Sequence, residues 1–416
     1  MKKIAVIVIM AAAFIMPAII PKQSDAMPGF ARKYRISCQV CHAPFPRLKE
    51  YGDEFAGNGF RLPEGENERR YYTDGGDDLM MLQRDFPLGA RFDLYVSHEP
   101  DRDPSNTDLK TPWLAKIISG GPIYKNISYY FYFYMSEHGE VAGIEDALLY
   151  FQDLGGTGVN VTAGQFAVSD PIFKNELRLT FEPYQLLKIH PTLSDTDLMY
   201  DRGVVVDYSF DFGLDIVGEV INGNGLEEAE NDSYDKDDYK NYMLRMSQSV
   251  GPVRFGGFYY LGMEDGLSVG AAATADPEVN HIDYYGGDMT ITFEKDTFEI
   301  NALYLVRKDS NPHFLADDDE TMGQGVMVEM LIQPEGDQGR WAFTGLYNDF
   351  DSDYEEVIDG TTVDALDYQT GTFQVSYLMS RNVRAIAEYT YIIRDYSKGE
   401  DYHDRSRYMA GVVAGF

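Results

Sequence analysis

The sequence predicts a mainly β protein, in which an antiparallel transmembrane β-barrel of about 16 strands follows a small α-helical domain at the N-terminus. Three observations predict this fold class. Apolar and polar residues alternate with a period of two in many segments after residue 87, short and long connections alternate between these segments, and the only two cysteines lie together near the start. A period of two is typical of β-strands, whose successive side chains point to opposite faces.

Residues 1–26 have the pattern of a secretory signal peptide. Lys2 and Lys3 precede an apolar run, and Ala26 ends a short polar stretch that follows it. Segments of this kind are removed on export. An N-terminal membrane anchor is the alternative, but the apolar run is short for a membrane-spanning helix.

The composition limits which classes of partner the protein can bind. The chain has 68 acidic and 35 basic residues and a formal net charge of −33, which argues against nucleic-acid binding because phosphate contacts need a basic surface. After the signal, no apolar run is long enough for a transmembrane helix. A membrane role therefore requires a β-barrel, and outer-membrane lipid is the first expected partner.

The next segment, residues 27–86, contains the motif Cys38-x-x-Cys41-His42. This spacing suits a redox dithiol, half of a metal site, a structural disulfide or the covalent attachment of haem. A zinc site needs about four ligands, and the chain has no second cysteine pair. Haem attachment uses all three residues, because two thiols add to the vinyl groups and the histidine becomes the proximal iron ligand. We therefore expect one covalent haem c in a monohaem cytochrome c domain, which agrees with export to an oxidising compartment.

Local signals suggest how residues 27–86 fold. Ser37 is a candidate cap for a turn that carries the cysteines, and Pro46 is a candidate first residue of a second helix that ends at Gly57-Asn58-Gly59. About 60 residues are too few for a large core, so haem and the barrel wall are expected to supply apolar contacts.

The sixth ligand of the haem iron has several candidates. Met81 or Met80, at the end of the small domain, would supply a thioether that raises the haem potential. An open position or a second histidine is the alternative. The histidines available are His98, His138, His190, His281, His313 and His403.

Residues 87–416 are predicted to form the barrel. In residues 203–212 and 383–394, apolar side chains occupy one face and polar side chains the other. The predicted strands are 87–97, 112–119, 123–136, 143–152, 158–167, 202–212, 214–222, 239–250, 253–262, 280–293, 297–307, 324–333, 339–349, 368–379, 383–394 and 404–416. Short turns on one side and long loops on the other are typical of outer-membrane barrels, and the last residue is the aromatic Phe416.

The long connections differ in character. Three are acidic, at 227–238, 316–320 and 349–359, and by strand parity they face the cell exterior. These segments are either solvated loops without a specific partner or a field that concentrates divalent cations at the barrel mouth. The connection at 168–200 either folds inward, so that Lys174, Arg178 and Lys188 line the pore, or stays outside with short helices.

The N-terminal motif also resembles a known family. Phe30-Ala31-Arg32, then Cys38, Cys41 and His42, then Phe45-Pro46-x-Leu48, Tyr51-Gly52, Phe55 and Gly59 resemble the fused cytochrome–porins of the outer membrane, best known as iron oxidases of neutrophilic iron-oxidising bacteria. Lys49 departs from the asparagine expected after Leu48 in much of that family. The likeness covers about 35 residues, and the barrel agrees only in architecture and length.

The resemblance implies an outer-membrane oxidoreductase. Electrons would pass between an extracellular donor or acceptor, such as Fe(II) or an electron shuttle, and a periplasmic carrier such as a cytochrome. The alternative function is a solute or ion porin in which the haem-bearing domain is a structural or regulatory plug.

Overall fold

The computed structural model describes residues 29–62, 86–102, 106–124, 126–226, 228–229, 232–266, 278–293, 297–315, 319–358, 360–399 and 402–416. The predicted signal peptide and the candidate ligands Met80 and Met81 lie outside these residues.

Sixteen strands form one closed antiparallel barrel, as predicted. Each strand pairs with its neighbours along the chain, and β1 pairs with β18 to close the barrel. The strands are β1 (Leu88–His98), β2 (Thr107–Tyr124), β3 (Ile127–Glu137), β4 (Gly143–Phe151), β5 (Asn160–Ala167), β6 (Tyr200–Ser209), β7 (Leu214–Ile221), β8 (Asn241–Val250), β9 (Val253–Asp265), β10 (Val279–Phe293), β11 (Phe298–Asp309), β12 (Thr321–Ile332), β13 (Trp341–Ser352), β16 (Tyr368–Ser380), β17 (Val383–Asp395) and β18 (His403–Gly415).

Two connections differ from the prediction. The turn expected at Gly120-Gly121-Pro122 is wrong, because β2 runs through these residues to Tyr124 and its pairing with β3 is irregular after Pro122. A proline is tolerated where a strand ladder breaks, since it has no N–H to donate. The long connection after β13 contains an additional hairpin of β14 (Glu355–Ile358) and β15 (Thr361–Asp364).

The two faces of the wall have opposite character. On β8, Tyr242, Leu244 and Met246 point outward and are exposed, while Arg245 points inward and pairs with Asp288 of β10 at 2.6 Å. An apolar outer surface around a polar interior is what a lipid-embedded barrel requires. No helix in the described part of the chain is long and apolar enough to cross a membrane.

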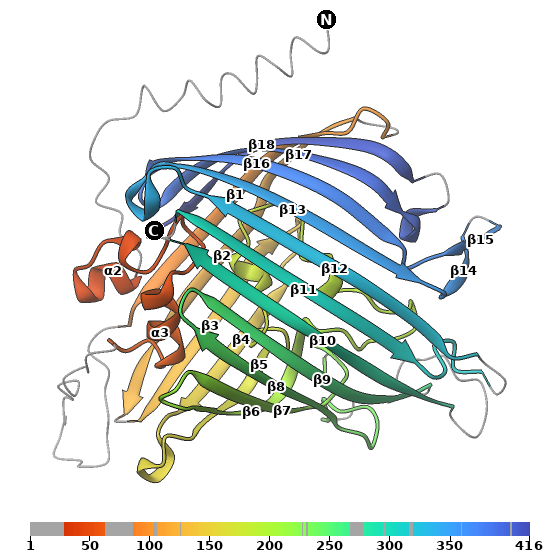
Figure 1. Ribbon diagram of the computed structural model, residues 1–416, viewed down its shortest axis with the longest axis horizontal. Helices are drawn as coiled ribbons and strands as arrows, with labels where there is room; N and C mark the ends of the chain where they lie inside the picture. Colours follow the sequence, from red (N-terminus) through yellow and green to blue (C-terminus); the bar gives the residue numbers. More distant parts are fainter. Residues whose placement is uncertain are drawn as a thin grey trace, which may run out of the picture.

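The ends of the barrel also differ. The N-terminal elements α2 (Gly29–Tyr34), η2 (Cys38–Val40) and α3 (Glu50–Gly57) lie at the end where the C-terminus is found, while β14 and β15 lie at the opposite end (Figure 1). At the C-terminal end, Phe416 exchanges backbone hydrogen bonds with Ala90 across the closing seam. The acidic connections lie at the long-loop end, as strand parity predicted.

The connection from β5 to β6 folds into the barrel, and this settles the two alternatives for residues 168–200. It contains the short 3-10 turns η4 (Asn175–Leu177) and η5 (Gln185–Leu187). Leu186 and Leu187 are fully buried in a core that also includes Leu305 and Met327 of the inner wall. Apolar packing therefore fills part of the lumen, and the loop is fixed to the wall.

Candidate functional site

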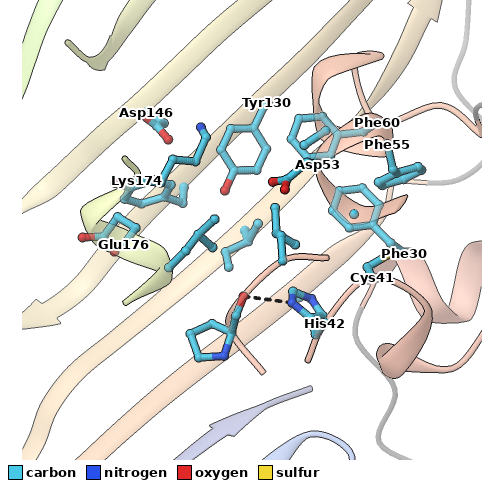
Figure 2. Close-up of a pocket in the computed structure, with 18 of the residues that line it drawn as sticks. Phe30, Cys41, His42, Asp53, Phe55, Phe60, Tyr130, Asp146, Lys174 and Glu176 are labelled. Carbon is cyan, nitrogen blue, oxygen red and sulfur yellow. Dashed lines mark hydrogen bonds between the residues drawn. The ribbon is translucent and has the colours of Figure 1, made fainter. Parts of the chain in front are cut away.

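The motif Cys38-x-x-Cys41-His42 lines a cavity of about 420 Å³ between the N-terminal segment, the inner wall and the inward loop. Figure 2 shows Cys41 and His42 on one side of this cavity, with Asp146, Lys174 and Glu176 on the other. Ligand pockets in proteins typically have volumes of about 300–1,000 Å³. The cavity is therefore large enough for a cofactor-sized ligand, and it lies inside the barrel.

The cysteines lie on a single tight turn. Cys38 begins η2, and its carbonyl accepts the backbone N–H groups of Cys41 at 3.2 Å and His42 at 2.9 Å. Ser37 occupies the predicted cap position but makes no side-chain capping bond. Both thiols are free and half-buried. Burial raises the pKa of Cys38, and it raises the pKa of Cys41 to about 11 with help from Cys38. A redox dithiol works through a thiolate, so this environment disfavours that alternative.

The ring of His42 is oriented as a metal ligand would be. Its Nδ1 lies 2.9 Å from the carbonyl oxygen of Pro46 and 3.3 Å from that of Arg47. Because a carbonyl can only accept, Nδ1 carries the proton and Nε2 keeps a free lone pair. Metal-binding histidines usually donate their second N–H to a carbonyl or carboxylate in this way. Burial lowers the pKa of His42, which favours the neutral ring, the form that a metal ligand requires.

The segment after His42 differs from the prediction. Pro46 does not begin a helix, because α3 begins four residues later at Glu50, and the carbonyl of Pro46 serves His42 instead. The carbonyl of Cys41 accepts the backbone N–H of Lys49 at 2.9 Å. An added Cβ at Gly52 would lie 2.4 Å from the same oxygen. Only glycine therefore lets α3 pack against the cysteine turn.

Aromatic side chains form the apolar wall of the cavity. Phe30 and Phe60 stack with ring centroids 5.2 Å apart, and Phe55 meets both edge-on. Phe60 also stacks on Tyr130 of the barrel wall at 4.5 Å. These contacts join the small domain to the barrel, as expected for a domain too small to have a large core.

Ion pairs fix the N-terminal segment in the lumen. Arg47 pairs with Glu299 of β11 and, at 2.8 Å, with Glu329 of β12. Lys49, the residue that departs from the family pattern, lies 2.7 Å from Asp337 in the turn between β12 and β13. The lysine at this position therefore has an ion-pair partner in this chain.

A second chamber of about 430 Å³ lies beyond the first, toward the long-loop end. The two chambers share Arg91, Glu176 and Tyr200 as lining residues. Glu176 accepts hydrogen bonds at 2.8 Å from Lys116 and from the hydroxyl of Tyr134. Burial alone would raise the pKa of Glu176, but Lys116 and Arg178 lower it well below its usual range. An ionised carboxylate thus stands between the chambers.

The predicted pore residues line the two chambers as the inward-loop alternative required. Lys174 lines the chamber of the cysteine motif, while Arg178 and Lys188 line the outer one. Of the six alternative histidines, His138 and His190 line the outer chamber, and none lines the cavity of His42. The structure therefore gives the histidine alternative no support, and the methionine alternative stays a prediction.

Sequence reasoning missed the wall residues of the cavity. Asp146 of β4 and Glu219 of β7 point inward and line it, together with Asp170 of the loop. Alternation gave only a weak signal: Glu219 shares its strand face with Asp215 but also with Val217 and Ile221, and Asp146 shares its face with Leu148 and Tyr150. Their convergence with the cysteine motif depends on barrel closure and on the path of the inward loop, which alternation does not reveal.

The comparisons with known proteins concern the barrel. No protein-family model and no curated protein matches the chain. Among solved structures, OmpT of Vibrio cholerae in its trimer form is 12% identical with a TM-score of 0.53, over 80% of this chain and 99% of the other. The channel DcaP of Acinetobacter baumannii is 14% identical with a TM-score of 0.54, over 80% and 97%. An anion-selective porin from Comamonas acidovorans is 9% identical with a TM-score of 0.52, over 80% and 99%.

At these identities the likeness concerns the fold alone. It agrees with the closed 16-strand barrel, its apolar outer surface and its polar interior, which together confirm the predicted location in an outer membrane. The chain therefore has the architecture of an outer-membrane porin, with a cysteine–histidine motif inside its lumen.

Proposed function

We propose that this protein is an outer-membrane electron conduit that carries one covalent haem c on Cys38, Cys41 and His42. Electrons pass between an extracellular donor or acceptor and a periplasmic carrier such as a small cytochrome. One observation carries the proposal: the motif lines an intraluminal cavity, with Nδ1 of His42 held by the Pro46 carbonyl and Nε2 left free.

The chain's own residues support this role. The cysteines share one turn, so two thioether bonds on that turn would hold the cofactor against the aromatic wall. Phe30, Phe55 and Phe60 exclude water from that side of the cavity. When bound, haem supplies a one-electron couple between ferric and ferrous iron.

The position of the cavity shortens the distance that electrons have to cross through the membrane. The apolar band of an outer-membrane barrel is about 25 Å tall, and the chain has only one haem motif. A cofactor held within the lumen leaves less of this thickness to cross than one left in the periplasm. The polar outer chamber adjoins the cavity through Arg91, Glu176 and Tyr200, and it offers a space where a hydrated ion such as Fe(II) can approach.

The test uses proteoliposomes with a soluble cytochrome trapped inside and Fe(II) added outside. The expected result is reduction of the protein's haem followed by reduction of the trapped cytochrome. Cys38→Ala with Cys41→Ala should abolish both steps and should also remove haem staining on a denaturing gel. A wild-type protein without covalent haem would refute the proposal.

A second candidate function is that of a porin, which the shared fold favours. Under this alternative, the N-terminal segment is a structural or regulatory plug. The same vesicles distinguish the two functions, since sugars or anions would then pass freely while the trapped cytochrome stays oxidised.

A further inference from the structure

Two buried carboxyl groups line the cysteine–histidine cavity, and each has a carboxylate oxygen without a hydrogen-bond partner among the described residues. Glu219 is 3% exposed, and neither of its carboxylate oxygens has a hydrogen-bond partner. Asp146 is 7% exposed, and its Oδ1 likewise has none. Both residues line the cavity. Buried charges in proteins are normally paired or hydrogen-bonded, so these two groups require another explanation.

The cations of the cavity form their ion pairs with other carboxylates, although Lys174 and Lys116 also act electrostatically on Asp146. Lys174 pairs with Asp170, Lys116 pairs with Glu176 at 2.8 Å, and Arg91 pairs with Asp93 at 2.8 Å. Burial would lower the pKa of Lys174, but Asp170 and Asp146 raise it above its ordinary value. Asp170 also acts electrostatically on both Asp146 and Glu219. The charged and titratable groups around these two residues are Asp53 of α3, Arg91 of β1, Lys116 of β2, Tyr130 and Tyr132 of β3, Tyr150 of β4, Asp170, Lys174 and Glu176 of the inward loop, and Tyr200 and Asp201 of β6.

A proton is the ligand that fits these two carboxyl groups. Within the described residues, no three His, Cys, Asp or Glu side chains are grouped so as to hold a metal ion. A buried carboxylate without a cation becomes neutral by taking up a proton. A protonated carboxyl group also gains a hydrogen-bond donor, which an ionised one lacks.

We propose that Glu219 and Asp146, which line the same cavity from β7 and β4, each bind a proton in a manner coupled to reduction of a haem held in that cavity, an inference that rests on the proposed function. If an external one-electron reductant reduced a haem held on Cys38, Cys41 and His42, one proton from water would bind a carboxylate oxygen of Glu219 or Asp146. The added electron makes the cavity more negative, so the reduced state raises the proton affinity of both carboxylates. Electron uptake and proton uptake then favour each other, as linked binding equilibria require.

The sign of the pH effect follows from this coupling. Between the pKa values of the pair in the oxidised and reduced states, the reduced protein binds more protons. The midpoint potential therefore falls as pH rises, by up to about 59 mV per pH unit for one proton per electron. Outside that window the potential is independent of pH.

The test is a redox titration of the purified full chain from acid to alkaline pH, alongside reduced-minus-oxidised infrared spectra. The wild type should show the falling potential and a positive C=O band of a protonated carboxyl group in the reduced state. Glu219→Gln combined with Asp146→Asn should remove both signals while leaving haem attached. This variant should fold, since replacing a buried unpaired charge with a neutral isostere relieves a cost.

Glu264→Gln is the matched control. Glu264 is also a buried inner-wall glutamate, 2% exposed, but it accepts hydrogen bonds from Ser194 and Thr196 and lies outside the cavity. The Glu264→Gln variant should keep the wild-type change of midpoint potential with pH and the wild-type C=O band. The proton coupling is overturned if the midpoint potential of the double variant still falls with pH, or if the wild-type potential does not depend on pH. Either result leaves the proposed function intact. A protein without covalent haem overturns the proposed function as well.

Discussion

At the scale of single residues, the cysteine–histidine turn depends on close backbone contacts. The carbonyl of Cys41 accepts the N–H of Lys49, and Gly52 of α3 passes directly beside the same oxygen. The position of His42 therefore depends on a helix that starts eight residues later in the chain. This explains why glycine occupies position 52 inside a helix, where it costs about 0.5–1 kcal/mol relative to alanine.

Two glycine substitutions in α3 test this contact. Gly52→Ala should destabilise the N-terminal segment by about 1–3 kcal/mol, because the new Cβ would lie 2.4 Å from a backbone oxygen and overpacking has costs of this order. It should also reduce haem incorporation, measured as haem absorbance per protein. Gly57→Ala meets nothing within 4 Å and should lower neither property, because alanine in a helix is more stable than glycine by up to about 1 kcal/mol. Equal effects of the two substitutions would contradict the packing role of Gly52.

At the scale of elements, the N-terminal segment and the inward loop are held to the barrel by buried ion pairs. Arg47 lies between Glu299 and Glu329 and also donates to the hydroxyl of Tyr184 at 3.0 Å. It therefore joins the small segment, the loop and the wall at one point. Lys49 makes a more exposed pair with Asp337 near the barrel rim.

Arg47 and Lys49 should contribute unequally to the stability of the docked N-terminal segment. Arg47→Met leaves the buried carboxylate of Glu329 and the half-buried carboxylate of Glu299 without their cation, and breaking a buried ion pair costs about 3–5 kcal/mol of folding stability. Lys49→Met should cost at most about 1 kcal/mol, as is typical of solvent-exposed pairs. Limited proteolysis of the folded protein should therefore release the N-terminal segment readily in the Arg47 variant only. Similar protease resistance in both variants would show that Arg47 does not anchor the segment.

The inward loop should resist release at low pH. Because the pKa of Glu176 is lowered in the folded state, its pair with Lys116 stabilises the docked loop above the ordinary glutamate pKa. That contribution declines as pH falls below the ordinary glutamate pKa, and it is lost completely only below the depressed folded pKa. The ring centroids of Trp113 and Phe181 of the loop lie 5.1 Å apart. The fluorescence of Trp113 can therefore report loop docking once Trp341, the other tryptophan, is replaced by phenylalanine.

In that Trp341→Phe background, acid should change the Trp113 signal only well below the pH at which free glutamate protonates. Glu176→Gln should change the signal already at neutral pH, since it leaves the ammonium of Lys116 buried without a carboxylate. A transition at the ordinary glutamate pKa in the parent would refute the stabilising role of this pair.

At the scale of the whole molecule, the barrel could be predicted from the sequence and its interior could not. Alternation in segments such as 203–212 identifies strands and the side chains that share a face, because a strand has a period of two wherever it lies. The path of residues 168–199 depends on side chains such as Leu186 packing against distant wall strands, a contact that no local pattern reveals. The cysteine motif predicted haem attachment, whereas the approach of Asp146 and Glu219 to that motif follows from closure of the barrel.

Under the proposed function, the charge of the whole molecule predicts how soluble electron donors would approach it. Exposed acids such as Glu228 and Asp238 lie at the long-loop end, and the chain carries a formal net charge of −33. A cationic donor should therefore be steered to the outer mouth, and salt should slow its reduction of the haem because the Debye length is about 8 Å at physiological ionic strength. An anionic donor should show the opposite salt dependence. The measurement is stopped-flow haem reduction across a range of salt concentrations.

Two pairs of variants test whether the acidic residues at the long-loop end steer the cationic donor. Glu228→Gln with Asp238→Asn should slow reduction by the cationic donor and weaken its salt dependence. Asp211→Asn with Glu335→Gln removes the same charge from turns at the opposite end and should change the rate far less in vesicles where only the outer mouth faces the donor. If both pairs change the rate equally, net charge rather than the outer mouth controls the encounter. The steering by the acidic loops would then be rejected, while the conduit would still stand on the vesicle experiment.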